Sequence, residues 1–164
     1  LIRIIVGDIE PTAGTISYEG PTADRPIGYL PQDPTFRPGF TAAETLAFYS
    51  SLVDGSDPEP LLERVGLTAA ADRNVEALSG GMRQLLGIAQ ATVGDPPLVV
   101  LDEPASGLDP NMSASVYGTA AEMAGAGTTV LLSSHDMTLV EETADSILVL
   151  DRGTVAAAGT IEEL

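Results

Sequence analysis

Residues 98–135 restrict the fold more than any other stretch of this 164-residue chain, because they predict two strands joined by a helix. The run Leu98–Leu101 is continuously apolar, which is typical of a strand buried on both faces. Asp109 and Pro110 are residue types that begin a helix, and the run 128–132 predicts a second buried strand. Strands that alternate with helices form a parallel sheet covered by helices, so the sequence predicts a layered α/β domain.

Further elements are expected on both sides of this unit. Residues 1–6 predict the last turns of a helix that ends at Gly7, and Ile16 and Tyr18 alternate with polar residues as in a strand. The run Ile27–Leu30 predicts a short strand that the following prolines end. The other expectations are helices over 58–65 and 82–93, a helix capped by Asp136, and a terminal hairpin of 147–150 with 154–157.

The stretch 41–93 has a helical pattern throughout and interrupts the alternation of strands and helices. Thr41 and Glu44 have the spacing of a capping box, in which each side chain binds the other residue's backbone amide. We interpret 41–93 as an inserted helical subdomain, and 1–40 together with 94–164 as the sheet-containing core. No apolar run approaches the roughly 18 residues that span a bilayer.

The chain carries 24 acidic residues against seven arginines and no lysine, for a net charge of −17. This charge repels nucleic acids and anionic lipid headgroups, so direct binding to nucleic acid is not expected. The charge indicates either ordinary acidic solubility or adaptation to high salt, where screening over about 3 Å at 1 M removes the self-repulsion. The absence of cysteine excludes disulfides and thiolate metal sites, and a cytoplasmic protein is the default expectation.

Acidic and imidazole side chains follow the two buried strands, at the end of a parallel sheet where ligands bind. Asp102 suits a Mg²⁺ ligand, and Glu103 can polarise an attacking water as a general base. His135 can donate a hydrogen bond to a γ-phosphate oxygen and hold that water in line. The plainer alternatives are a solvated acidic turn for the pair and a structural role for the histidine.

Three other features have both a functional and a plainer interpretation. The turn Ser79–Gly81 precedes a helix, whose free amides can bind an anion, although a capped flexible turn has the same sequence. Gln32 lies between two prolines after a strand and can be an ordinary loop residue. Asp109 can be a helix cap only, a role that Pro110 favours equally.

The order and spacing of these motifs resemble those of the ATP-binding-cassette (ABC) ATPases. The motifs that carry the resemblance are YLPQ at 29–32, LSGGMRQ at 78–84, LVVLDEP at 98–104, SGLD at 106–109 and His135. They resemble the family's Q-loop, signature, Walker B, D-loop and switch histidine, and the resemblance extends over essentially the whole chain. It implies a P-loop NTPase-like, RecA-type layered sheet with an inserted helical subdomain.

The resemblance also implies roles in ATP hydrolysis with Mg²⁺. Gln32 would sense the metal and the attacking water, and Asp102 would hold the metal. Glu103 would be the catalytic base, and His135 would contact the γ-phosphate.

The same resemblance implies that other residues act across a dimer of two such subunits. Ser79, Gly80 and Gly81, together with Gln84, would bind the ATP that the partner subunit holds. Asp109 would couple the two sites.

The sequence departs from the family in one respect, because no G-x-x-x-x-G-K-S/T phosphate loop occurs in it. In the family, the equivalent of residues 1–14 follows that loop directly. The expectation is therefore that the first strand and the phosphate loop lie upstream of Leu1, and that this chain alone neither binds ATP well nor hydrolyses it.

The implied function is the ATPase subunit of an ABC transporter, held at the inner face of the cell membrane by a separate permease. The permease would contact the helical subdomain and the loop after Gln32. The sequence as a whole looks most like the one-cassette subunits of export or ABC-2-type systems. It has a weaker similarity to the cassette proteins of copper-site maturation in nitrous oxide reductase. The alternatives are a soluble ABC protein that acts on ribosomes or DNA, and a non-catalytic remnant.

Overall fold

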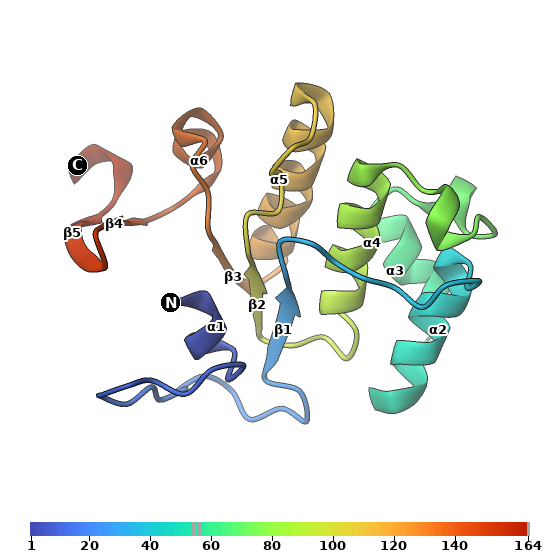
Figure 1. Cartoon of the computed structure of the whole chain (residues 1–164), viewed down its shortest axis with the longest axis horizontal. Coiled ribbons are helices and arrows are strands. Elements are labelled where there is room, and N and C mark those ends of the chain that lie inside the picture. The colour runs from blue at the N-terminus through green and yellow to red at the C-terminus, as the bar shows by residue number, and fades with distance from the viewer. Residues whose placement is uncertain (54, 56, 164) are drawn as a thin grey trace.

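The computed structural model describes residues 1–53, 55 and 57–163, and a three-stranded parallel sheet lies at its centre (Figure 1). The strands are β1 (Ile27–Leu30), β2 (Leu98–Leu101) and β3 (Thr129–Leu132), in the order β1-β2-β3. Leu101 pairs with Leu30 on one side and with Leu132 on the other, so the three strands end at the same level. The bounds of β1 and β2 are those predicted from the sequence.

Helices cover the sheet, and a separate antiparallel hairpin follows it. The helices are α1 (Ile2–Ile5), α2 (Ala42–Val53), α3 (Pro58–Arg64), α4 (Gly80–Ala91), α5 (Pro110–Gly125) and α6 (Met137–Thr143). Short 3₁₀ turns lie at Thr68–Ala70, Val75–Ala77 and Ile161–Glu163. The hairpin consists of β4 (Ile147–Asp151) and β5 (Thr154–Gly159), and Figure 1 shows it on the opposite side of the sheet from α2, α3 and α4.

Side-chain caps explain where α2, α5 and α6 begin. Thr41 Oγ1 accepts from the Glu44 amide at 3.1 Å, and a Glu44 carboxylate oxygen accepts from the Thr41 amide at 2.8 Å, as the capping box predicts. Asp109 Oδ1 accepts from the first amides of α5, and Asp136 Oδ1 accepts from the Leu139 amide at the start of α6. The sequence therefore encodes these helix starts locally.

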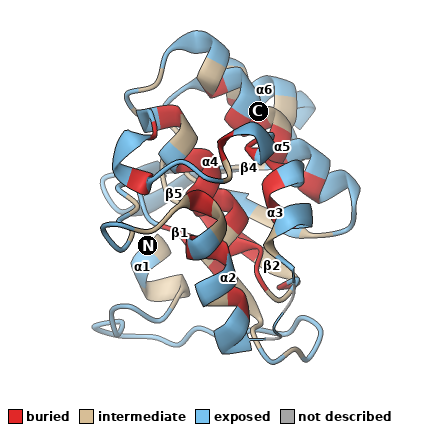
Figure 2. Ribbon diagram, turned by 90° about the vertical axis from the view of Figure 1, so that its right-hand side faces the viewer, coloured by how far each residue is buried: buried red, intermediate tan, exposed pale blue. Residues whose placement is uncertain are grey.

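The hydrophobic core lies between the sheet and α2, α3, α4 and α5. Figure 2 shows buried residues concentrated along α4 and the strands beside it. Completely buried members of this core include Leu46, Leu86, Ile88, Val93, Val99, Leu101 and Val116. Their burial gives the strongest contribution to stability, about 1.5–3 kcal/mol for each large apolar side chain.

Helix α4 packs directly on β1, backbone against backbone. A Cβ placed on Gly28 would lie 1.9 Å from the Ala91 carbonyl oxygen, so only glycine fits at this position of the strand. The Arg25 guanidinium, just before β1, donates to the carbonyls of Gln90 and Val93 at 3.1 and 2.8 Å. These bonds attach the segment before β1 to the carboxyl end of α4.

Two expectations about strands were wrong. The described residues 15–18 form no strand, and the side chains of Ile16 and Tyr18 are 49% and 40% exposed. This segment pairs with no other strand, and an apolar–polar alternation alone does not hold a strand together. The third strand, β3, is not buried on both faces: Leu131 is 38% exposed, because β3 lies at the edge of the sheet.

None of the helices in the described part of the chain is long and apolar enough to cross a membrane.

Candidate functional site

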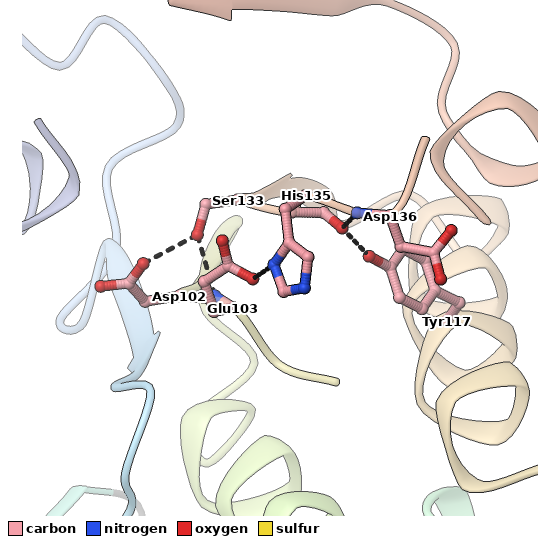
Figure 3. Close-up of polar contacts among 7 residues, drawn as sticks. Asp102, Glu103, Tyr117, Ser133, His135 and Asp136 are labelled. Carbon is pink, nitrogen blue, oxygen red and sulfur yellow. Dashed lines mark hydrogen bonds and ion pairs between the residues drawn. The ribbon is translucent and has the colours of Figure 1, made fainter. Parts of the chain in front are cut away.

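The pairing of β2 with β3 brings together the polar residues that follow the two strands. Leu101 lies opposite Leu132, so Asp102 and Ser133 come next to each other at the end of the sheet. Ser133 Oγ donates to Asp102 Oδ1 at 2.7 Å and accepts from the Glu103 amide at 2.8 Å (Figure 3). One hydroxyl group therefore fixes both residues of the acidic pair relative to β3.

Glu103 and His135 lie against each other. Glu103 Oε2 is 2.8 Å from His135 Nδ1, and the Glu103 backbone has a φ of +46°. This left-handed conformation is unusual for a residue other than glycine and is held by the surrounding hydrogen bonds. A carboxylate only accepts, so the contact places an imidazole proton on Nδ1. The glutamate side chain is 27% exposed and that of the histidine 77%.

A hollow of about 630 Å³ lies beside this group, in the size range of small-ligand sites. Asp102, Gln32 and Asp33 line one part of it, and Arg3 and Tyr29 line another. Burial raises the pKa of the Tyr29 phenol, and the negative charge of Asp102 adds to this shift. The phenol therefore stays neutral. Gln32 and Asp102, which the sequence places 70 residues apart, face the same space.

Mg²⁺ fits the donor set at this hollow. The carboxylates of Asp102 and Asp33 and the amide oxygen of Gln32 are the hard oxygen ligands that this ion prefers. Within the described ranges, no group of three or more His, Asp or Glu side chains could hold a metal ion by itself. This is compatible with Mg²⁺, which proteins usually bind through one or two carboxylates with water and substrate phosphates completing the shell.

The predicted residues of the signature turn lie together with the start of α5, in a second group. Ser79 caps α4 by accepting from the Met82 amide at 3.2 Å, and a Cβ on Gly80 would lie 3.8 Å from Leu108. A Cβ on Gly81 would come within 2.5 Å of the Met112 side chain. Asp109 uses its carboxylate to cap α5. Among the described residues, no side-chain hydrogen bond or ion pair joins this group to Glu103 or His135.

Gln84 lies inside the protein rather than on the exposed start of α4. Its side chain is buried, and Nε2 donates to the backbone carbonyl of Gln32 at 2.8 Å. Its other amide atom, Oε1, has no hydrogen-bond partner within the described part of the chain. The structure therefore connects two sequence-predicted residues, Gln84 and Gln32, through a backbone contact that the sequence did not predict.

Sequence reasoning missed three hydroxyl groups at the site. Ser133 links Asp102 to Glu103, while Ser134 Oγ accepts from the Asp136 amide at 2.9 Å and from the Tyr117 hydroxyl. The available signal was the pair of serines directly before His135 at the end of a predicted strand. Successive side chains of a strand point to opposite faces, so two consecutive hydroxyls can serve two different neighbours.

Comparison with known proteins finds a matching family model and related sequences. A family model described as ABC transporter matches residues 1–106. The uncharacterized ABC transporter ATP-binding protein YxlF of Bacillus subtilis (strain 168) is 36% identical over 171 residues, which cover 99% of this chain and 58% of YxlF. The Nod factor export ATP-binding protein I of Cupriavidus metallidurans is 32% identical over 176 residues, again covering 99% of this chain and 58% of the relative.

Solved structures show the same fold. The structure of an ATP binding subunit of an ABC transporter matches with a TM-score of 0.82 and 31% identity, over 99% of this chain and 73% of that one. The cbiO1 protein of Clostridium perfringens, part of the ABC transporter complex cbiONQ, matches in fold with a TM-score of 0.85 at 23% identity, over 99% and 72% of the two chains. The chain spans less than three fifths of the length of the two curated relatives above. It belongs to the ABC transporter family.

Proposed function

We propose that this chain is part of the ATP-hydrolysing subunit of an ABC transporter. The observation that carries the proposal is the group formed by Asp102, Glu103 and His135, held together through Ser133 at the ends of β2 and β3. A general base must lie within hydrogen-bonding reach of the water that it activates, and a parallel sheet binds its ligands at this end. Gln32 faces the adjoining hollow and completes the set.

Asp102 and Gln32 would hold Mg²⁺, with Asp102 placed by its hydrogen bond from Ser133. The bound ion would neutralise charge that develops on the phosphate oxygens. Glu103 would accept a proton from the attacking water through its carboxylate. His135 would orient that carboxylate through Nδ1 and, when protonated, donate from Nε2 to a phosphate oxygen. The hydrogen bond between the two side chains keeps the base and the donor in a defined relation.

The residues of the second group would act in a dimer of two such subunits. The amides at the start of α4, after Ser79, would bind the ATP held by the partner subunit, because a helix start attracts anions. Gly80 and Gly81 would allow close approach of the phosphates, and Gln84 would support this turn from within α4. Asp109 would couple the two sites at the neighbouring start of α5.

The partner in the membrane would be a separate permease that contacts α2 and the loop after Gln32. Phe48 stacks edge-on with Phe40 and Tyr49, with ring centroids 6.2 and 5.4 Å apart, and Arg37 lies over the Phe40 ring. Phe48 and Leu52 are 41% and 66% exposed, so an apolar surface is available beside that loop. The protein would then lie peripherally on the cytoplasmic face of the membrane. The Nod factor export relative supports an export system in particular.

The experiment that tests the catalytic proposal is the substitution Glu103→Gln in the native protein, as its own gene encodes it. We expect ATP turnover to be abolished while ATP binding is retained and an ATP-bound dimer accumulates, because the amide cannot accept the water proton. Glu122→Gln on the exposed surface of α5 makes the same chemical change outside the site and should leave turnover unchanged. Unchanged turnover in Glu103→Gln would remove this residue from the role of base.

The partner proposal has its own test. Affinity purification of the tagged native protein from detergent-solubilised membranes should recover a multi-span membrane protein. The variant Phe48→Ala should weaken that recovery, whereas Tyr18→Ala, an exposed aromatic residue outside α2, should not. Recovery of ribosomes or DNA in place of a membrane protein would contradict the proposal.

A further inference from the structure

We propose that Tyr117 and Ser134 are positioning residues that hold His135 against Glu103. The inference rests on the proposed function for its catalytic consequence, although its geometric content does not depend on ATP hydrolysis. It assigns a role to the hydrogen bond from Tyr117, in the middle of α5, to Ser134, just after β3. This bond involves neither residue of the acidic pair and no residue that lines the hollow.

His135 is placed by the backbone around it rather than by packing of its own ring. Its side chain is 77% exposed, and its contact with the rest of the site is the hydrogen bond from Nδ1 to Glu103. An exposed side chain with one hydrogen bond samples other rotamers readily, because ordering it costs conformational entropy. The position of the imidazole therefore depends on how firmly residues 133–136 are held.

Ser133 and Ser134 hold this segment from two sides. Ser133 Oγ binds Asp102 and the Glu103 amide at the end of β2. Ser134 Oγ accepts from the Asp136 amide, which closes a turn around His135, and from the Tyr117 hydroxyl in α5. Figure 3 shows the imidazole between these two sets of bonds, directed toward Glu103. Without the bond to Tyr117, no side-chain hydrogen bond among the described residues would join this turn to α5, and on that side the turn would depend on the packing of α6, which Asp136 caps.

Tyr117 is a suitable anchor because it is buried in a long helix and remains protonated. Its side chain is 2% exposed and lies in the 16-residue helix α5, whereas β3 is an edge strand with exposed residues. Burial raises the pKa of the Tyr117 phenol, so the hydroxyl keeps its proton and donates throughout the ordinary pH range. The buried Tyr117 thus restrains the turn that carries the exposed His135, through the hydroxyl of Ser134.

The same bond connects His135 to the start of α5. Asp109 caps this helix eight residues before Tyr117, a distance of roughly 12 Å along the helix axis. A displacement of α5 therefore moves Ser134, and with it the imidazole, relative to Glu103. The proposal therefore predicts that Asp109 and His135, which share no hydrogen bond or ion pair among the described residues, are coupled through the body of the helix.

The decisive experiment follows the tautomer of His135 in the 164-residue chain, where it is the single histidine. Long-range ¹H–¹⁵N NMR spectra of the imidazole, recorded where the ring is neutral, report which nitrogen carries the proton. In the unaltered chain we expect the proton on Nδ1, as the bond to Glu103 requires. In Tyr117→Phe, which keeps the ring and removes the hydroxyl, the spectrum should shift toward a mixture of tautomers.

Matched variants separate positioning from general destabilisation. Tyr18→Phe removes a phenol hydroxyl that donates to the Pro21 carbonyl outside the site, and its spectrum should equal that of the unaltered chain. Ser134→Ala should reproduce the effect of Tyr117→Phe, and Ser134→Thr, which retains a hydroxyl, should restore the Nδ1 tautomer. If Tyr117→Phe does not fold, Ser134→Ala decides the question.

Activity gives a second readout in the protein expressed from its native reading frame. Tyr117→Phe should lower kcat by about tenfold with KM for ATP nearly unchanged, because misplacing a catalytic group costs on the order of ten- to a hundredfold. A wild-type tautomer in both Tyr117→Phe and Ser134→Ala would overturn the inference, as would a mixture of tautomers in the unaltered chain. Absence of ATP hydrolysis in the unaltered protein would instead overturn the proposed function and leave the NMR result standing.

Discussion

Gln84 in α4 donates a hydrogen bond of 2.8 Å from Nε2 to the backbone carbonyl of Gln32, across 52 residues of sequence. The helix α4, which Ser79 caps, is therefore bound to the segment that lines the hollow beside Asp102. Two motifs that the sequence shows as separate form one hydrogen-bonded unit.

Gln84→Leu tests whether this bond matters for function more than for stability. Leucine has a similar volume and also removes the buried Oε1, which lacks a partner within the described chain. The free energy of unfolding should therefore fall by only about 1 kcal/mol. ATP turnover of the native protein should fall, because the backbone of Gln32 loses its donor. Denaturant unfolding and a turnover assay check the two parts. Gln90→Leu on the same helix is the control, and a loss above about 3 kcal/mol with unchanged turnover would contradict the prediction.

Ser133→Ala should lower both stability and activity. The change removes the donor to Asp102 and the acceptor of the Glu103 amide, and each lost bond is worth about 1 kcal/mol. Denaturant unfolding should therefore show a loss of roughly 1–2 kcal/mol. Ser51→Ala removes a hydroxyl that donates to the Phe48 carbonyl on the exposed side of α2 and should cost less. Equal losses in the two variants would show that Ser133 has no special role.

Gly28→Ala and Gly118→Ala should have opposite effects on stability. A Cβ at residue 28 meets the Ala91 carbonyl oxygen at 1.9 Å, where neither backbone can yield easily, so we expect a loss of about 3 kcal/mol or more. A Cβ at residue 118, inside α5, meets nothing within 4 Å and should stabilise the protein by about 0.5–1 kcal/mol. Thermal unfolding of both variants measures this difference. A stable Gly28→Ala protein would show that α4 does not lie directly on β1.

Salt should stabilise the protein if its acidic surface is an adaptation to high salt. The net charge is −17, and the described residues contain two arginine–aspartate ion pairs, Arg3–Asp8 and Arg64–Asp95, so most carboxylates repel one another. Raising KCl from about 0.1 to 1 M shortens the screening length from about 10 to 3 Å, and the melting temperature should rise. A melting temperature that falls or stays constant over this range would refute the high-salt hypothesis.

Local signals predicted much of this fold. The bounds of β2 came from an apolar run between turn residues, and helix starts came from caps such as Asp109 and Thr41. The sequence also placed Glu103 and His135 at the same end of a parallel sheet, where the structure joins them, although their roles remain predictions. These features depend on a few neighbouring residues or on the parallel geometry itself.

The errors and omissions depend on distant parts of the chain. A strand at Ile16 requires a partner strand, and the burial of Leu131 depends on what covers the edge of the sheet. The hydrogen bond between Tyr117 and Ser134 depends on how α5 packs against β3. The presence of a serine and a tyrosine in the sequence does not predict that packing. Such contacts follow from tertiary packing and could not be read from residue patterns.

The packing of α4 on β1 also determines how motion can pass through this protein. Arg25 donates to carbonyls at the carboxyl end of α4, Gly28 lies closely against its last turn, and Gln84 in its first half donates to the carbonyl of Gln32. The helix, roughly 18 Å long, is thus connected at two separate points to β1 and the residues that flank it. A displacement of α4 would therefore also shift the backbone at Gln32, and we expect the helix and the strand to move together rather than as independent parts.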